Sequence, residues 1–294
     1  MDHSDADYLR IACANLHFGG ISRTGDLSPL FETLAVLSGW DVHIALLQEV
    51  SAGDEIGLKK HVRLIASELG MTLAALGARA PMTYGPNRPA VFVREPAGLK
   101  IVDYGPPEGV SGGVPAAWVH ARVAILGVGN ELDLLSVHLP PRSAVEQERQ
   151  AEWMASSIAQ WGKPALACGD FNSFAPGGPA LTEQQLREMD PHLRPARMIV
   201  EDGRFRPDYT VHDELTAIDM VDVAAALDPD ARHPHDLTAT GASGGRIDRG
   251  YATRELKDAL RGYWQAPGGS DHEHFMIALS KSAMSAARPR GYRP

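Results

Sequence analysis

Cysteine is scarce in this 294-residue chain, which contains only Cys13 and Cys168. Both lie in apolar stretches, where a cysteine usually packs as a small hydrophobic side chain, so we expect no disulfide between them. The N-terminal residues are acidic and lack the basic and apolar regions of a signal peptide. These two observations favour a cytoplasmic protein.

Long hydrophobic runs and positive charge are also in short supply. No run of about 18 apolar residues occurs, so the sequence predicts no membrane span. The chain has 28 Lys and Arg against 37 Asp and Glu, a formal net charge of −9, and no long basic cluster. Because affinity for duplex DNA comes largely from neutralising phosphates, this composition argues against a strong nonspecific grip on DNA. A phosphate-bearing substrate stays compatible with it, because a divalent metal can supply positive charge locally.

The remaining composition is that of an ordinary globular protein, with 44% hydrophobic and 22% charged residues. We find no repeat and no low-complexity linker. The sequence therefore predicts one domain over residues 1–280, followed by a basic C-terminal tail over residues 281–294. It does not indicate an oligomeric state.

Apolar patterning and turn residues predict mixed secondary structure. We expect a helix from Ser28 as its N-cap to Gly39, and a second helix over residues 55–69. A third begins at the capping box Ser143–Glu146 and ends near Trp161. Strands are expected at residues 8–15, 42–47, 90–94, 117–128, 131–138, 165–168 and 275–279. Residues 190–245 have weak periodicity, and their position between two motifs suggests a lid over the site.

Polar residues capable of chemistry stand at the ends of these strands. The strand at 165–168 is followed by Gly169, Asp170 and Asn172, and the same arrangement recurs elsewhere. The full set is Asn15, Glu49, His138, Asp170, Asn172, Asp248, Asp271 and His272. If the last strand runs against the others, all of them gather at one edge. Singly, each is explained as a turn residue, a loop histidine or half of a surface ion pair.

Taken together, four carboxylates at one edge would repel one another without a cation. An oxygen-rich set without cysteine suits Mg²⁺ or Mn²⁺ better than zinc. The joint pattern therefore predicts a site for a hard divalent metal.

In order along the chain, Asn15, Gln48-Glu49, Ser136-Val-His138, Gly169-Asp-Phe-Asn172, Arg246-Ile-Asp248 and Ser270-Asp-His272 resemble the signature of the endonuclease/exonuclease/phosphatase superfamily. The resemblance spans residues 9–279. It implies an α/β fold of four layers, in which two mostly antiparallel sheets pack face to face with helices outside. It also implies a Mg²⁺-dependent hydrolase of phosphoric esters.

The resemblance implies a role for each matching residue. The implied metal ligands are Glu49, Asn15, Asp271 and Asp170. The implied catalytic residues are Asp170, His272, His138, Asn172 and Asp248, with Asp248 orienting His272 and raising its pKa. The implied substrate contacts are Asn172, His138, Asn87 and Arg88, to which His17 and Tyr84 are added. His212, His233 and His235 are expected to be loop residues.

Two departures from the family bear on the site and its substrate. Histidine at position 138 resembles the deoxyribonuclease, sphingomyelinase and phosphatase branches more than the abasic-site repair branch. Arg249-Gly-Tyr251 after Asp248 leaves the orientation of Asp248 open. The leading hypothesis is hydrolysis of a phosphodiester, with DNA or RNA as candidate substrates. The alternatives are a phosphomonoesterase acting on a metabolite or lipid headgroup, and a non-catalytic binding module.

Overall fold

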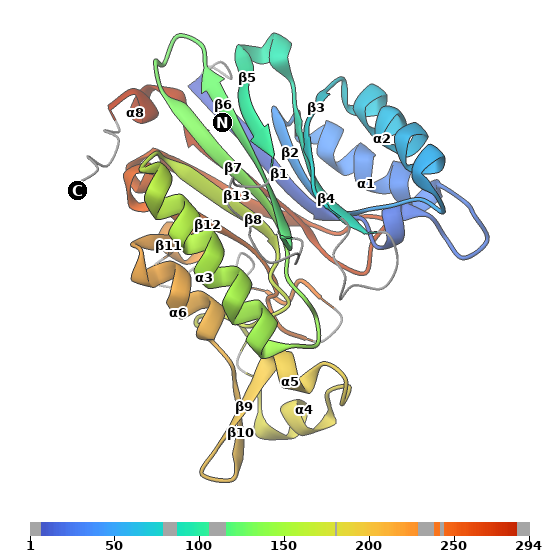
Figure 1. Cartoon of the computed structure of the whole chain (residues 1–294), viewed down its shortest axis with the longest axis vertical. Coiled ribbons are helices and arrows are strands. Elements are labelled where there is room, and N and C mark those ends of the chain that lie inside the picture. The colour runs from blue at the N-terminus through green and yellow to red at the C-terminus, as the bar shows by residue number, and fades with distance from the viewer. Residues whose placement is uncertain are drawn as a thin grey trace.

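The computed structural model describes residues 7–78, 87–105, 116–179, 181–228, 238–241 and 244–286. These residues form two six-stranded sheets that pack face to face (Figure 1). The first sheet has the order β13 (Leu260–Ala266), β14 (His274–Ser280), β1 (Tyr8–Asn15), β2 (Ile44–Val50), β4 (Arg88–Val93) and β3 (Thr72–Leu76). The second has the order β11 (Met220–Asp222), β12 (Asp248–Thr253), β8 (Ala165–Asp170), β7 (Glu131–His138), β6 (Trp118–Ile125) and β5 (Leu99–Gly105).

The two sheets share one pattern of strand direction. Each has a single parallel pair at its centre, β1–β2 in the first sheet and β7–β8 in the second. All other pairings within the two sheets are antiparallel. The predicted fold, two mostly antiparallel sheets with helices outside, is therefore confirmed.

Helices cover the outer face of each sheet. The helices α1 (Ser28–Gly39) and α2 (Glu55–Leu69) share a buried cluster with the first sheet. On the second sheet, α3 (Ala144–Trp161) and α6 (Thr210–Ala217) do the same. Shorter helices are α7 (Val223–Leu227), α8 (Lys281–Ala286), η2 (Phe18–Gly20), η3 (Glu95–Ala97) and η5 (Arg254–Ala259). No helix in these described ranges is long and apolar enough to cross a membrane.

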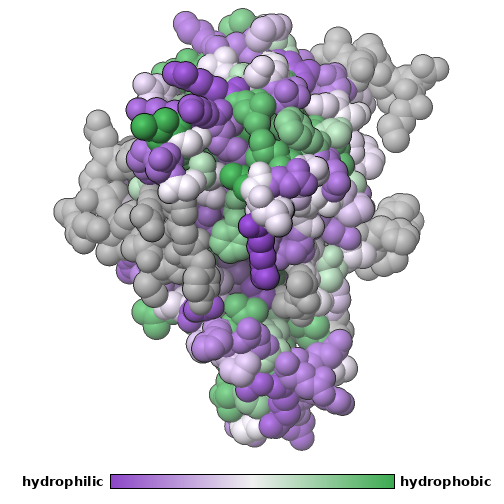
Figure 2. All heavy atoms as spheres, turned by 90° about the vertical axis from the view of Figure 1, so that its right-hand side faces the viewer, coloured by the Kyte–Doolittle hydropathy of each residue, from purple (hydrophilic) through white to green (hydrophobic). Residues whose placement is uncertain are grey.

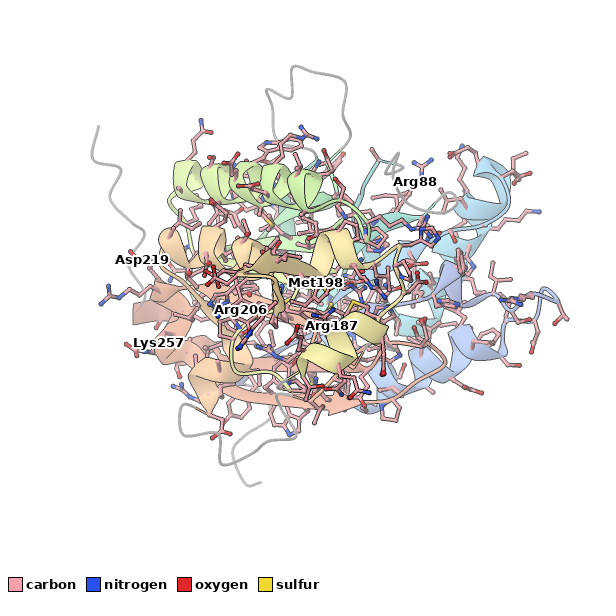
Figure 3. All side chains as sticks on the ribbon, turned by 90° about the horizontal axis from the view of Figure 1, so that it is seen from below. Arg88, Arg187, Met198, Arg206, Asp219 and Lys257 are labelled. Carbon is pink, nitrogen blue, oxygen red and sulfur yellow. The ribbon has the colours of Figure 1, made fainter. Side chains whose placement is uncertain are left out.

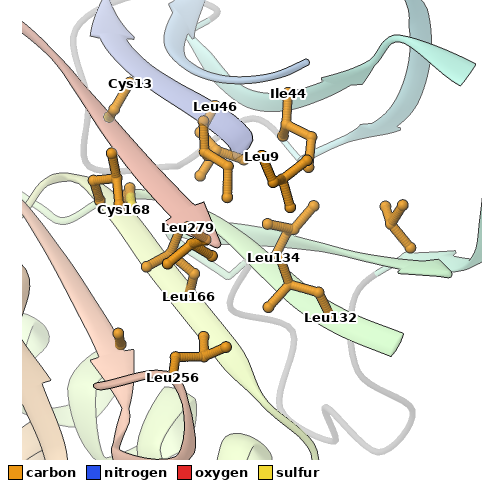
Figure 4. Close-up of a cluster of buried hydrophobic side chains, with 14 of the residues drawn as sticks. Leu9, Cys13, Ile44, Leu46, Leu132, Leu134, Leu166, Cys168, Leu256 and Leu279 are labelled. Carbon is orange, nitrogen blue, oxygen red and sulfur yellow. The ribbon is translucent and has the colours of Figure 1, made fainter. Parts of the chain in front are cut away.

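The main core lies between the sheets, where leucine, isoleucine and valine side chains from both inner faces interlock (Figure 4). Cys13 and Cys168 belong to this core as free, buried thiols, and burial raises the pKa of each. The expectation that they pack as small hydrophobic side chains is confirmed. The face in Figure 2 carries mainly hydrophilic side chains around a narrow hydrophobic strip.

A small segment projects from one end of the sheets. Residues 181–208, here called the edge segment, contain α4 (Glu183–Glu188), α5 (Arg194–Arg197), β9 (Met198–Glu201) and β10 (Arg204–Pro207). Leu186, Met189 and Met198 attach it by packing against Phe174 and Ile247. Seen from below in Figure 3, the segment lies across the middle of the molecule, with Arg187 and Met198 near the centre of the view.

The structure corrects several local predictions. Leu27, not Ser28, is the N-cap of α1, and no side chain caps that helix. The described parts of residues 190–245 do not form one lid, because their first part belongs to the edge segment whereas α6, β11 and α7 complete the second sheet and its helices. Residues 281–286 of the predicted tail form α8, and the remaining tail residues lie outside the described ranges.

Candidate active site

Strand direction explains why distant polar residues meet. Asn15 ends β1, and Glu49 is the penultimate residue of β2, its parallel neighbour. In the other sheet His138 ends β7 and Asp170 ends β8, again in parallel. The carboxyl ends of both central pairs lie at the same edge of the sandwich, where Asn15 Nδ2 is 3.2 Å from Asp170 Oδ2.

The antiparallel neighbours bring the remaining residues to this edge. Asp248 opens β12 directly opposite Asp170. Because β14 runs antiparallel to β1, its N-terminal end lies beside the carboxyl end of β1, and His272 stands two residues before it. The expectation that the last strand runs against its neighbour and completes one edge is confirmed.

Gly169 shapes the backbone at Asp170. We expected it to end the strand, but β8 continues through it to Asp170. A Cβ atom at this position would lie 1.8 Å from the carbonyl oxygen of Val137 on β7. Glycine is therefore required because the two parallel backbones approach too closely for any side chain.

Strained backbone is concentrated here. Seven non-glycine residues in the described ranges have positive φ, and four of them are His17, Phe18, Glu49 and Asn172. A bulge in β2 between Leu47 and Val50 accompanies the turn of Glu49 toward the site. Such conformations cost about 1–3 kcal/mol each, and they persist where the surrounding structure holds a functional geometry in place.

Hydrogen bonds fix the carboxylate of Asp170. Its Oδ1 accepts the backbone N–H of Asn172 at 2.8 Å. Its Oδ2 accepts from the side-chain amides of Asn15 at 3.2 Å and Asn172 at 3.1 Å. Asp170 is 2% exposed, so the carboxylate is buried and oriented before any ligand arrives.

Glu49 faces Asp170 across Asn15. Its Oε2 accepts the Phe18 N–H at 2.8 Å and the Asn87 side-chain amide at 2.7 Å. Its Oε1 has only a long contact of 3.5 Å with Asn15 Nδ2. One oxygen of Glu49 is therefore held by the protein, whereas the other is left for a ligand.

His272, which is half-buried, pairs with the buried Asp248. The distance from His272 Nδ1 to Asp248 Oδ2 is 2.8 Å, and the backbone N–H of Asp248 donates to the Thr240 hydroxyl. Burial favours neutral imidazole, but the carboxylates of Asp248, Asp170 and Asp271 outweigh it and raise the pKa of His272 to about 10. His272 is therefore an imidazolium at neutral pH.

The same geometry excludes a surface ion pair for Asp248. Arg246 instead pairs with Asp222 through two contacts of 3.2 and 2.5 Å, and both side chains are buried. Arg249 donates to the Ser173 hydroxyl at 2.8 Å. The orientation of Asp248, left open by the sequence, is toward His272.

His138 completes the group. Its Nε2 lies 3.7 Å from both Glu49 Oε1 and Asp170 Oδ2. These distances are too long for hydrogen bonds. The imidazole nitrogen therefore points into the space between the carboxylates, where it can reach a bound group.

Arg197 is a site residue that sequence reasoning missed. It lies on α5 of the edge segment, and its Nη2 donates to Asn172 Oδ1 at 2.7 Å. Both Asn172 amide hydrogens are also engaged, by Asp170 and by the Leu139 carbonyl. Asn172 therefore acts here as a support for Asp170. Nothing in the weakly periodic sequence around Arg197 indicates this contact.

The structure places the other predicted residues in different positions. His17 Nδ1 lies 2.9 Å from Asp271 Oδ1, so these two half-exposed residues meet above the site. Arg88 instead pairs with Glu55 of α2 and is not among the residues that line the cavity. His212 is helical rather than a loop residue, since it lies in α6 beside Tyr251. Tyr84, His233 and His235 lie outside the described residues.

The group surrounds a cavity of about 180 Å³, here called the catalytic cavity. Its lining consists of His17, Phe18, Glu49, Asn87, His138, Pro141, Asp170, Asn172, Asp271 and His272. Most of the residues predicted from the sequence are therefore brought together.

The donor set fits a hard divalent metal. Mg²⁺ is usually bound through one or two carboxylates and several waters. Glu49 Oε1 offers such a carboxylate, and Asn87 Oδ1 beside it is buried without a hydrogen-bond partner among the described residues. Asp170, Asp248 and His272 also lie close together, but His272 Nδ1 and Asp248 Oδ2 are already bonded to each other at 2.8 Å. Glu49 is thus the better anchor.

No protein-family model matches this sequence, and no curated protein matches it. Solved structures do. An AP endonuclease from Archaeoglobus fulgidus superposes with a TM-score of 0.62 at 16% identity, covering 92% of this chain and 99% of that one. An endonuclease/exonuclease/phosphatase family protein from Bacteroides thetaiotaomicron gives 0.59 at 16% identity, covering 92% and 97%. A mannosyl-6-phosphatase from Bacteroides thetaiotaomicron gives 0.57 at 14% identity, covering 92% and 98%.

At these identities the likeness concerns the fold, and it agrees with the resemblance in sequence motifs. The chain has the fold of the endonuclease/exonuclease/phosphatase family.

Proposed function

We propose that this protein belongs to the endonuclease/exonuclease/phosphatase superfamily and hydrolyses a phosphodiester with the aid of Mg²⁺. The observation that carries the proposal is the catalytic cavity itself. An oriented carboxylate at Asp170, a ligand-ready oxygen of Glu49 and a positively charged His272 face one small space. Phosphoester hydrolysis needs a positioned water and positive charge at the phosphoryl oxygens.

The residues have distinct roles in this reaction. Asp170 binds the attacking water through its carboxylate and receives its proton. The imidazolium of His272, held by Asp248, donates a hydrogen bond to a phosphoryl oxygen. His138 Nε2 lies on the other side of Asp170 and can donate to the phosphate or the leaving oxygen. A divalent metal bound at Glu49, with Asn15 and Asp170 beside it, would supply further positive charge for the phosphate.

Space on two sides of the site favours a diester. Asp271 and His272 line the catalytic cavity on one side and a second cavity of about 520 Å³ on the other. A phosphoryl group at His272 would therefore have room for ester groups in two directions. The fold itself does not discriminate, because its relatives include both an AP endonuclease and a mannosyl-6-phosphatase.

The test compares hydrolysis of a model diester and the matching monoester, bis(p-nitrophenyl) phosphate and p-nitrophenyl phosphate, in Mg²⁺ and in EDTA. We expect Mg²⁺-dependent diester hydrolysis that EDTA abolishes. Cleavage of the monoester alone would replace the proposal with a phosphatase. No cleavage of either, together with no Mg²⁺ binding by calorimetry, would favour the non-catalytic binding module.

A further inference from the structure

The second cavity, here called the side cavity, lies next to the catalytic cavity and is the larger of the two. Its volume of about 520 Å³ falls within the range of about 300–1,000 Å³ typical of small-molecule sites. The edge segment forms one wall through α4 and residues 189–197, and Ile247, Asp271 and His272 contribute to the rest of the lining. The two cavities share His272, so a molecule whose phosphate lies at His272 would extend into the side cavity.

Arg197 gives this cavity a recognition group. The residue lines the cavity and is only 4% exposed, yet its Nε has no hydrogen-bond partner among the described residues. Its one partner there is the neutral amide oxygen of Asn172. The carboxylates of Asp170 and Asp248 act on the Arg197 charge through space, and no hydrogen bond joins either of them to Arg197 among the described residues. A buried N–H without an acceptor is costly, and an acceptor atom of a ligand at Nε would remove that cost.

The charges of the cavity exclude a second phosphate as that acceptor. Three carboxylates, those of Glu188, Asp190 and Asp271, line the cavity with Arg197 and His272. Glu188 uses one oxygen for Gln184, and Asp190 uses one for the His192 N–H. Their second oxygens can accept hydrogen bonds from hydroxyl groups but would repel an anion.

Apolar side chains supply the remaining surface. Met189 and Ile247 are buried in the walls, and Leu193 also lines the cavity. The occupant must therefore offer hydroxyl donors, an oxygen acceptor and a face of C–H groups. A sugar ring has all three on one small, uncharged frame.

We propose that the side cavity binds the sugar ring of a phosphoester substrate, either as part of a nucleoside or as a simple sugar. This assignment rests on the proposed function for the phosphate, which lies at the neighbouring site. Arg197 contacts a ring oxygen or hydroxyl oxygen, Glu188 and Asp190 accept from ring hydroxyls, and Met189 and Leu193 pack on the C–H face. Since Arg197 also holds Asn172, sugar binding and the orientation of Asp170 share one residue.

The experiment measures binding without chemistry. Methyl β-D-ribofuranoside, adenosine and glycerol are titrated against the full chain by saturation-transfer difference NMR, in EDTA and without phosphate. We expect the riboside to bind at millimolar concentration or better and glycerol at least tenfold more weakly. Tighter binding of adenosine than of the riboside would identify a nucleoside, and equal binding a simple sugar.

Two variants locate the binding. Leu193→Trp fills the cavity and Glu188→Gln removes an acceptor charge, and each should weaken riboside binding at least tenfold. Glu183→Gln is the matched control on the same helix, because Glu183 pairs with Arg187 and does not line the cavity. Far-UV circular dichroism and the thermal midpoint verify that the variants fold.

Equal binding of the riboside and glycerol, or undiminished riboside binding by folded Leu193→Trp, would overturn the proposal. Failure of the enzymatic function has a different signature. Ring-dependent binding that Leu193→Trp abolishes, with no phosphoester hydrolysed in Mg²⁺, would contradict the catalytic proposal while leaving the sugar site in place.

Discussion

The carboxylate of Asp170 shows how much a single residue depends on its supports. Three donors fix its two oxygens, and they come from Asn15 in one sheet and Asn172 just beyond β8. We expect Asp170→Asn to lower kcat about 10²- to 10⁴-fold, because the amide cannot accept the proton of the attacking water. The measurement is Mg²⁺-dependent hydrolysis of the model diester. Asp213→Asn, an exposed change on α6, is the control, and full activity of Asp170→Asn would contradict the assigned role.

The pair formed by His272 and Asp248 gives a prediction about pH. Burial alone would lower the pKa of His272, and the carboxylates raise it to about 10. In Asp248→Asn the largest of these contributions disappears, so the pKa of His272 should fall toward or below the ordinary value near 6.5. The imidazolium would then lose its proton as the pH rises through neutrality.

Histidine ring NMR measures this pKa directly, and the alkaline limit of kcat should move to lower pH with it. Asp271→Asn is the comparison, because Asp271 is half-exposed and should shift the pKa of His272 less. An unchanged His272 titration in Asp248→Asn would mean that another group holds the proton.

At the scale of elements, the close approach of β7 and β8 presents Asp170. Gly169→Ala places a Cβ atom 1.8 Å from the Val137 carbonyl oxygen, so the two strands must separate. We expect the free energy of unfolding to fall by about 3 kcal/mol and diester hydrolysis to be lost with the geometry of Asp170. Urea unfolding and the activity assay measure the two effects.

Gly39→Ala is the control for that prediction. Gly39 lies in α1, and a Cβ atom there would meet nothing within 4 Å. Alanine in a helix is favoured over glycine by roughly 1 kcal/mol, so this variant should be neutral or slightly stabilised. If Gly169→Ala were equally harmless, close strand packing would not be the reason for glycine at 169.

Among the helices, α2 could be predicted from the sequence and the short helices of the edge segment could not. Strong apolar periodicity and a glycine stop predicted α2 at its observed bounds, and Gly70 ends it in the left-handed conformation. The edge segment had no comparable signal, because its helices have only six and four residues. Such short helices are held by packing of Leu186, Met189 and Met198 on the body, which is a tertiary effect.

At the scale of the whole molecule, buried histidines make stability depend on pH. Burial lowers the pKa of both His43 and His274 to about 4. Neutral His43 accepts the backbone N–H of Arg10, and His274 shares a hydrogen bond with Thr33. Their folded-state values lie below the unfolded value near 6.5. Their contribution to stability is therefore complete above pH 6.5 and is lost as the pH falls toward 4.

Urea unfolding between pH 6.5 and 4 should show this loss. Each histidine contributes a slope of at most about 1.4 kcal/mol per pH unit. In His274→Gln, which cannot titrate, the slope should decrease by about that amount, whatever the stability at pH 7. Equal slopes for the two proteins would show that His274 is not the responsible group.

The sequence by itself determined the class of fold, most strands and long helices, and most of the residues that line the catalytic cavity. It could do so because apolar periodicity and turn residues are local properties, and because the site residues follow strand ends. Only the tertiary structure decided which polar residues touch. It turned Asp248 toward His272 rather than toward an arginine, paired Arg88 with Glu55 of α2 and brought Arg197 into contact with Asn172. These contacts depend on strand pairing and on packing between segments far apart in the chain, which no local pattern specifies.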